Sequence, residues 1–444
     1  MIVVSSIFIV LISFYLFRKA SGSMRISKLN MISIAFYLYL ITMSYFGLTL
    51  AKIGVENYAL RKADIDSLTK AYYAASYGLL MLPSSMIFFK KILKFNTNKR
   101  INDFYNNKIS PSQTYNDSYI LFFFMFLSFV CFLACIYSFY SISYAPILSI
   151  FKGFSSDDIA SLRFSSKFDF NGIIYIKNLF FKNLAPFLSL VSLGYIKLFP
   201  KNYKLKFWHF FNVILAILAV TFSGEKAPLV VYFFMYFLAK SVINRGVSKK
   251  FLFIISTVSF SILIYLYLLI DKKFSFSFYG GIFSRIFMVP NAGLLQTFEL
   301  FPNYIDFLNG SSFPSWMIGI FGMEQQRSAR VVMEYLNPEG VVSGTTGVMN
   351  SLYMAEAYAN FGNLGLLLSP IIVGFTMICI YKLIIDSSAK TPTKVAFFAY
   401  FSFSLPLLGG MVGFIWNVGW IMLFIYVYLS RKMRFIAITN KWTK

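Results

Sequence analysis

Long apolar runs, separated by short polar segments, are the dominant pattern along this chain. A helix needs roughly 20 consecutive apolar residues to cross the hydrocarbon core of a membrane. Runs near this length are found at 2–17, 31–50, 71–89, 119–140, 176–196, 207–223, 227–240, 251–270, 361–382, 395–411 and 413–430. The pattern therefore predicts an all-α, polytopic integral membrane protein, a single membrane domain of residues 1–444 with about eleven transmembrane helices.

The composition supports this interpretation. Hydrophobic residues make up 58% of the chain and charged residues only 13%, whereas soluble domains are roughly one quarter charged. The three cysteines, Cys131, Cys135 and Cys379, lie inside apolar runs, which argues against a disulfide framework and a thiolate metal site. The sequence also lacks a P-loop, a G-x-G-x-x-G fingerprint and zinc-type His/Cys spacing, so no metal, nucleotide or organic cofactor is expected.

Lys and Arg residues are unevenly distributed between the runs. Of the 41 basic residues, 26 lie in the segments 18–30, 90–108, 197–206, 240–250, 382–394 and 431–444. This basic side is expected to be cytoplasmic, with the N-terminus outside and the C-terminus inside. The net charge of +24 then reflects topology and attraction to anionic membrane lipid rather than binding to nucleic acid. Two loops fall on the outer side, a smaller one at 141–171 and a larger, partly helical one at 271–350.

The smaller outer loop contains the sequence FSSDDIASLRFSSKFDF. Its paired carboxylates, Asp157 and Asp158, could hold a divalent cation or act as acid and base. They could equally be the first turn of a solvated helix capped by a serine. Arg163 alternates with serine and aromatic residues, a pattern that suits contact with sugar and phosphate.

The larger outer loop carries most of the remaining arginines. Arg285 stands just before an apolar stretch, and a helix is expected from 315 to 336, ending at NPEG. Spacings of three and four place one set of charges on a single face of that helix: Glu324, Arg327, Arg330 and Glu334. They form either a surface salt-bridge ladder or a site where arginines bind an anion such as pyrophosphate.

Two further ionisable positions stand out. The first is the pair Glu225 and Lys226, in TFSGEKAPLV, which in one interpretation forms a simple tight turn at the membrane surface. In the other, the turn is buried between helices and Lys226 is a buried cation that binds an anionic partner. His209 falls at the cytoplasmic end of its helix, the opposite side from the outer loops, which argues against a catalytic role for it. 

The stretch SLYMAEAYANFGNLGLLLSP combines polar residues with an apolar run. A single helix face would present Asn350, Tyr353, Glu356, Asn360 and Asn363, which follow one another at spacings of 3, 3, 4 and 3. A carboxylate at membrane depth is costly unless it faces protein or water. The stripe is therefore expected to line a hydrated cavity open to the outside, or to form hydrogen bonds with a neighbouring helix.

Several motifs of this sequence resemble those of the Wzy-type polymerases, the family that polymerises bacterial O-antigen and capsule repeat units. The resemblance lies in EAYANFGNLG at 356–365, SGEKAPLV at 223–230, SRIFMVP at 284–290 and Arg163, and in the overall plan of helices and outer loops. The family's outer loops carry an arginine followed by ten residues and a glycine. Neither Arg163 with Gly172 nor Arg330 with Gly340 matches that spacing.

The resemblance implies a glycosyltransferase at the periplasmic face of the bacterial inner membrane. Its substrates would be oligosaccharides linked to polyprenyl diphosphate, and its partners membrane lipid, a flippase and a chain-length regulator. We expect Arg285 and Arg330 to stabilise the departing diphosphate, and Glu356 to act as a general base or to orient an arginine. Residues expected to contact substrate are Arg163, Arg327, Lys226, Tyr353 and Asn360.

Three other functions fit parts of the sequence. A lipid-linked oligosaccharide flippase is also basic and multi-spanning, but it carries charged residues deep in several helices and has short outer loops. An O-antigen ligase uses a periplasmic histidine, which this sequence lacks. A polyprenyl-phosphate glycosyltransferase has its acidic pair in the first outer loop, whereas Asp157 and Asp158 follow the fourth apolar run.

Overall fold

The computed structural model describes most of the chain. The described ranges are 2–60, 63–111, 117–142, 144–152, 156–168, 170–246, 275–349, 351–386 and 389–428, with scattered single positions between them. The apolar run at 251–270 falls mostly outside these residues, and so does Asn350. The side chains of Asp157 and Lys226 also lie outside what the structure describes.

Every element in the described ranges is helical, which confirms the all-α prediction. The first half of the chain forms α1 (Ile2–Ser21), η1 (Ile26–Lys28), α2 (Met31–Ile34), η2 (Ala35–Tyr45), α3 (Phe46–Lys52), α4 (Ile65–Ile92), α5 (Thr97–Asn106), α6 (Asp117–Tyr140), α7 (Pro146–Phe151), α8 (Ser156–Phe168), η3 (Ile176–Leu184), α9 (Ala185–Leu198) and α10 (Tyr203–Thr221). The second half forms α11 (Lys226–Ile243), η4 (Ser284–Met288), α13 (Val289–Leu300), α14 (Ser315–Ile318), η5 (Gly319–Phe321), α15 (Ser328–Leu336), α16 (Pro338–Val342), α17 (Tyr353–Ile385), α18 (Pro392–Ser404) and α19 (Val412–Ile415).

Five of the described helices are long and apolar enough to cross a membrane. They are Ile2–Lys28, Ile120–Tyr140, Ile176–Leu198, Tyr203–Thr221 and Tyr353–Ile385, and two shorter apolar helices are Ala227–Ile243 and Val412–Tyr428. Several of them also expose large apolar side chains, as α1 does with Ile7, Phe8 and Leu11. These properties suit a membrane protein, while the full count of eleven spans stays a prediction.

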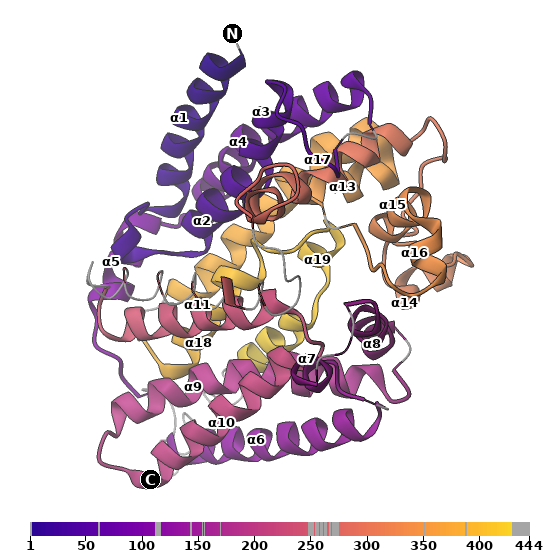
Figure 1. Cartoon of the computed structure of the whole chain (residues 1–444). Coiled ribbons are helices and arrows are strands. Elements are labelled where there is room, and N and C mark those ends of the chain that lie inside the picture. Colours follow the sequence, from indigo (N-terminus) through magenta and orange to yellow (C-terminus); the bar gives the residue numbers. More distant parts are fainter. Residues whose placement is uncertain are drawn as a thin grey trace.

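The helices pack in two connected groups. In one group α4 contacts α17, α1 and α13, and in the other α9 contacts α10, α18 and α11. Contacts of α18 with α2 and α17 join the two groups. Figure 1 places α5 at one edge of the molecule and α8 with α14, α15 and α16 at the opposite edge. The basic segment that contains α5 therefore lies at the opposite edge from the helices of the two outer loops, while the orientation in a membrane stays a prediction.

The larger outer loop contains a helix that is buried in the bundle. Of the 12 residues of α13, nine are buried, and the helix packs against α4 and α17. An apolar segment of about 10 to 14 residues is too short to span the membrane, but it is long enough for a buried or re-entrant helix. The segment 271–350 is thus not wholly an external loop, because residues 289–300 belong to the helical core.

Lys390 connects two helices at the end of the bundle opposite the outer loops. Its side chain is only 1% exposed, and Nζ donates hydrogen bonds to the carbonyl oxygens of Tyr105 at 3.3 Å, Asn107 at 2.9 Å and Val242 at 2.5 Å. The ammonium therefore joins the end of α5 to the end of α11. A buried charge is tolerated in such a place because it is fully hydrogen-bonded.

Replacing Lys390 by Met should destabilise the protein, because three carbonyls lose a charged donor while the buried stem is kept. The expected loss is about 2 to 4 kcal/mol, since a hydrogen bond to a charged group contributes roughly 1.5 to 3 kcal/mol. The measurement is the thermal unfolding midpoint of the detergent-purified protein. Lys204→Met, at an exposed position of α10, is the matched control. Equal midpoints for the two variants would contradict the stabilising role of Lys390.

Candidate functional site

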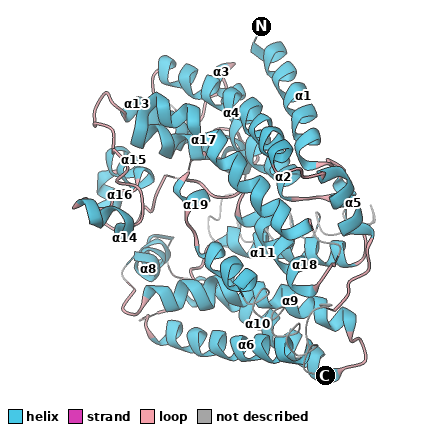
Figure 2. Ribbon diagram, turned by 180° about the vertical axis from the view of Figure 1, so that it is seen from behind, coloured by secondary structure: helices cyan, strands magenta, loops and turns pink. Residues whose placement is uncertain are grey.

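The larger outer loop packs on the first part of α17, and α8 of the smaller outer loop contacts the larger loop. Figure 2 shows α8, α14, α15 and α16 at one side of the molecule, with α19 between them and the main bundle. Glu356 lies in the first turns of α17, and α19 follows α18 through a glycine-containing turn. This end of the molecule therefore combines the motif at 356–365 with most of the arginines expected to act in the site.

Glu356 is held by a chain segment far away in the sequence. Its Oε2 accepts a hydrogen bond from the backbone N–H of Val412 at 2.7 Å, and the side chain is partly buried. A Cβ atom built on Gly410 would lie only 2.5 Å from the same oxygen, so a side chain at this position would displace the carboxylate. The turn that leads into α19 therefore packs directly against Glu356.

Arg327 lies at the position just before α15 and is exposed. α15 packs against α17, the helix that carries Glu356. Within the described residues no hydrogen bond or ion pair joins the guanidinium of Arg327 to the carboxylate. Both roles expected for Glu356, base or partner of an arginine, therefore stay predictions.

The helix expected from 315 to 336 is broken in two. Gly322 adopts a left-handed conformation with φ of 69°, which ends the first helical turns at 315–321, and α15 begins only at Ser328. Glu324 and Arg327 therefore precede α15 and do not share a helix face with Arg330 and Glu334. The prediction of four charges on one face is wrong, because one glycine interrupts the helical period.

Arg330 forms part of the salt bridge that the ladder alternative predicted. Its Nε lies 2.9 Å from Oε1 of Glu334, and its Nη1 donates to the carbonyl oxygen of Gly347 at 3.1 Å. The guanidinium carbon also lies 5.6 Å from the ring centroid of Phe164, at a cation–π distance. Arg330 thus contacts the smaller loop through the ring of Phe164 on α8, while its hydrogen bonds are made within the larger loop.

Arg163, next to Phe164 on α8, contacts the other motif stretch. Its Nη2 donates to the carbonyl oxygen of Gly224 at 2.7 Å. Gly224 has φ of 66°, and a Cβ there would crowd Pro146 at 3.2 Å and Nε of Arg163 at 3.4 Å. Consecutive residues of α8 therefore bind the turn before α11 and the larger loop.

Arg285 lies apart from this cluster. It is exposed on η4, which packs on η2, α3 and α13. Within the described ranges no hydrogen bond or ion pair is found for its side chain, and no contact joins it to Glu356. The guanidinium is therefore available to a ligand, but in a different part of the outer surface.

A break in α17 separates its polar residues. Phe361 and Gly362 leave the helical conformation, with φ of 58° at Gly362. A Cβ at Gly362 would lie 3.1 Å from the ring of Phe307, which fixes glycine at this point. Asn363 lies beyond the break and is exposed. The prediction of a continuous polar stripe is therefore wrong at Asn363, because the helix is interrupted at Gly362.

The backbone groups at the break are satisfied by the larger outer loop. The amides of Leu308 and Asn309 donate to the carbonyl oxygens of Ala359 at 2.9 Å and Asn360 at 3.0 Å. The Asn360 side chain, 1% exposed, donates to Oγ of Ser312 at 2.9 Å and accepts from its amide at 3.2 Å. Such pairing is required where carbonyls would otherwise be buried without partners.

Two residues expected to line the cavity are instead enclosed in the protein. Asn360 anchors the larger loop as described above, which corresponds to the hydrogen-bonding alternative for the stripe. Tyr353 is 0% exposed, and its ring packs edge-on against Phe414 with 6.0 Å between centroids. Both residues support the position of Glu356 from within the protein.

The remaining sequence candidates have simpler surroundings. α8 begins at Ser156 with Asp158 exposed, which confirms a helix in the smaller loop. His209 connects Ser192 at 2.8 Å and Tyr236 at 2.9 Å, between α9 and α11. Within the described residues no group of three or more His, Cys, Asp or Glu is placed to hold a metal ion.

Sequence reasoning missed the segment that holds Glu356. The stretch LLGGMVGFIW was assigned to two transmembrane runs, yet it forms a turn and the short helix α19 before a new helical segment at 418–428. Trp416, just after α19, packs against Trp316 of the larger loop with 5.2 Å between ring centroids. The closely spaced glycines at 409, 410 and 413 were the available signal, since glycine marks breaks in apolar helices.

Replacing Asn360 by Ala should loosen the larger outer loop while leaving the membrane-crossing part of α17 folded. The Ser312 amide loses its acceptor, and a buried unpaired donor costs roughly 1 to 3 kcal/mol. Limited proteolysis should then cut the segment 309–349 several-fold faster. Asn363→Ala, the same change at an exposed position of the same helix, is the control, and equal cleavage rates would contradict the anchoring role.

Comparisons with protein-family models, with curated proteins and with solved structures give no match to this chain. Its function is therefore inferred from its residues and their geometry.

Proposed function

We propose that the chain is a membrane glycosyltransferase that polymerises lipid-linked oligosaccharide repeat units into O-antigen or capsular polysaccharide. It would act at the periplasmic face of the bacterial inner membrane, with about eleven transmembrane helices, a periplasmic N-terminus and a cytoplasmic C-terminus. The observation that carries the proposal is the partly buried carboxylate of Glu356, which accepts from the Val412 amide in the part of α17 to which the larger outer loop is bonded. The motif resemblance described above names the substrate.

The reaction needs an acceptor base and a stabilised leaving group. An acceptor hydroxyl oxygen forms a bond to the anomeric carbon of the donor sugar, while the bond from that carbon to the diphosphate oxygen breaks. The polyprenyl diphosphate departs with the bonding electrons, and the hydroxyl proton passes to the Glu356 carboxylate. Arg327, exposed just before α15 in the loop that packs on α17, is the cation that stabilises the departing diphosphate.

The other arginines divide between binding and positioning. Arg330 forms a salt bridge with Glu334, and Arg163 donates a hydrogen bond to the carbonyl oxygen of Gly224. These two guanidinium groups therefore stabilise the loops rather than bind phosphate. A polymerase must also bind a second diphosphate-linked substrate, the acceptor. Arg285, exposed and distant from Glu356, is the candidate for that second anion site. Lys226, at the start of α11, is a further candidate cation, and Asn360 contributes through the loop anchor.

Two alternatives remain, a flippase and a ligase of the same pathway. A deletion strain separates all three functions through its surface glycan. A single repeat unit on the lipid anchor indicates the polymerase, trapped internal repeat units indicate the flippase, and unattached polymer indicates the ligase. Either of the last two outcomes would overturn the proposal.

Glu356→Gln should abolish long polymer while single repeat units persist. The amide keeps the shape of the side chain and can still accept from Val412, but it cannot take up a proton; loss of a general base typically slows a reaction by about 10² to 10⁴-fold. Polymer length is read from glycan ladders on gels, with protein levels checked. Glu334→Gln, the same change at an acid of the larger outer loop, is the control, and normal ladders from Glu356→Gln would remove the base role.

The variants Arg285→Gln and Arg163→Gln should distinguish an arginine that binds substrate from one that stabilises the fold. Arg285 has no described partner, so its loss should shorten or abolish polymer without changing the thermal midpoint. Arg163 donates to Gly224, so its loss should lower the midpoint and the polymer yield together. Full-length polymer from a stable Arg285→Gln protein would refute the second anion site.

A further inference from the structure

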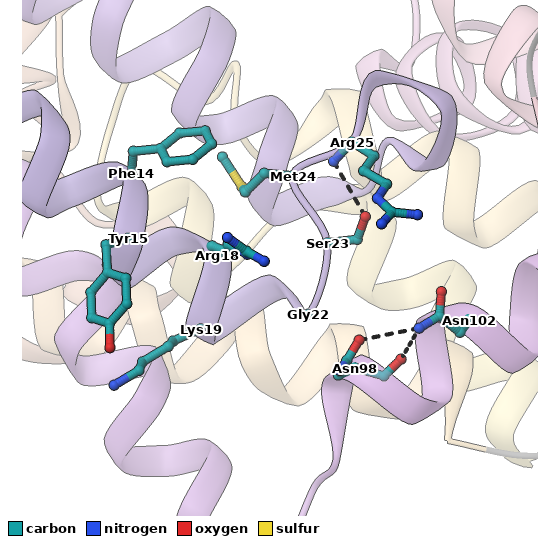
Figure 3. Close-up of a pocket in the computed structure, with 10 residues that line it drawn as sticks. All are labelled: Phe14, Tyr15, Arg18, Lys19, Gly22, Ser23, Met24, Arg25, Asn98 and Asn102. Atoms are coloured by element: carbon teal, nitrogen blue, oxygen red, sulfur yellow. Dashed lines mark hydrogen bonds between the residues drawn. The ribbon is translucent and has the colours of Figure 1, made fainter.

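A hollow lies at the end of α1, far from the outer loops. It encloses about 750 Å³ between the last turns of α1, the following turn and the start of α5. Figure 3 shows the side chains of Arg18, Lys19 and Arg25 around it, together with Asn98 and Asn102 of α5. None of these residues belongs to the site proposed above.

A glycine fixes the shape of this hollow. Gly22 ends α1 with φ of 79°, and its amide donates to the carbonyl oxygen of Arg18 at 3.1 Å. A Cβ at Gly22 would lie 2.6 Å from the backbone nitrogen of Asn98. The turn thus packs directly on the first turn of α5, which brings Arg18 and Arg25 to the same opening from two sides of the turn.

The opening has an uncompensated positive charge. No acidic residue lines it, and within the described ranges the side chains of Arg18 and Arg25 make no hydrogen bond or ion pair. Lys90 lies beside it and donates to the carbonyl oxygen of Lys19. Burial, and then the like charges of Lys19 and Lys91, lower the pKa of Lys90. Asp386, an acid at the same end of the bundle, is already paired with Arg100 and Lys382.

The face of α1 that leads to the hollow is apolar and open. Along this candidate span Ile7, Leu11 and Tyr15 are 54%, 60% and 54% exposed. An apolar face of this kind suits an acyl chain, and cations at the end of a span lie at the depth of lipid headgroups. Basic pockets between helices on the cytoplasmic side are places where anionic headgroups bind.

We propose that this hollow binds the phosphate group of an anionic phospholipid, with an acyl chain along the exposed face of α1. The charges of Arg18, Lys19 and Arg25 recognise the phosphate, and the exposed apolar side chains of α1 distinguish a lipid from a soluble phosphate ester. The inference is independent of the glycosyl transfer proposed above.

The test compares lipids on the full-length protein in detergent. Phosphatidylglycerol should raise the thermal unfolding midpoint by several degrees, and phosphatidylcholine should not. In the double variant Arg18→Gln/Arg25→Gln the apparent affinity for phosphatidylglycerol should fall tenfold or more. The control is Lys201→Gln/Lys204→Gln, which removes the same charge from exposed positions on the same predicted side.

The outcomes are distinct. An equal response to both lipids on the unaltered chain, which needs no variant, would overturn the proposal. An equal loss of affinity in the two double variants would also overturn it, because general charge attraction would then explain the binding. Glycerol 3-phosphate serves as the soluble probe. If it saturates the site as tightly as the lipid and depends on the same two arginines, the phosphate site is upheld and the lipid is refuted as its occupant.

Discussion

The break at Phe361 and Gly362 is the constraint on which the outer half of the structure depends. A helix interrupted inside an apolar bundle leaves carbonyl groups that must find donors. Here the donors are the amides of Leu308 and Asn309, so the larger outer loop is tied to α17 by its own backbone. Gly362 makes the break possible, since its φ of 58° disfavours other residues and Phe307 fills the space that a side chain would need.

The candidate site is built on this attachment. Once the larger loop is bonded to α17, Arg330 reaches the ring of Phe164. α8 then joins the loop to the turn at Gly224. The charged residues singled out by sequence thus serve unequal purposes. Two arginines hold the loops together, whereas Arg327 and Arg285 remain exposed to ligand.

Sequence alone predicts the parts of this fold that depend on local pattern. The apolar runs identify the helical, membrane-type architecture, because burial in lipid demands long uninterrupted hydrophobicity. The pattern fails where one residue changes the backbone, as Gly322 and Gly362 do, since periodicity assumes an unbroken helix. It also fails for α13, whose apolar run is too short to be recognised as part of the core. The contact of Gly410 and Val412 with Glu356 joins residues more than fifty positions apart, and no local sequence pattern predicts such a contact.

The attachment of the larger loop has a mechanical consequence. Residues 353–360 form a short helical segment that is bonded to the loop on one side and separated from the long apolar part of α17 by Gly362 on the other. Glu356 lies on this segment. Any tilt of the loop would therefore move the carboxylate with it.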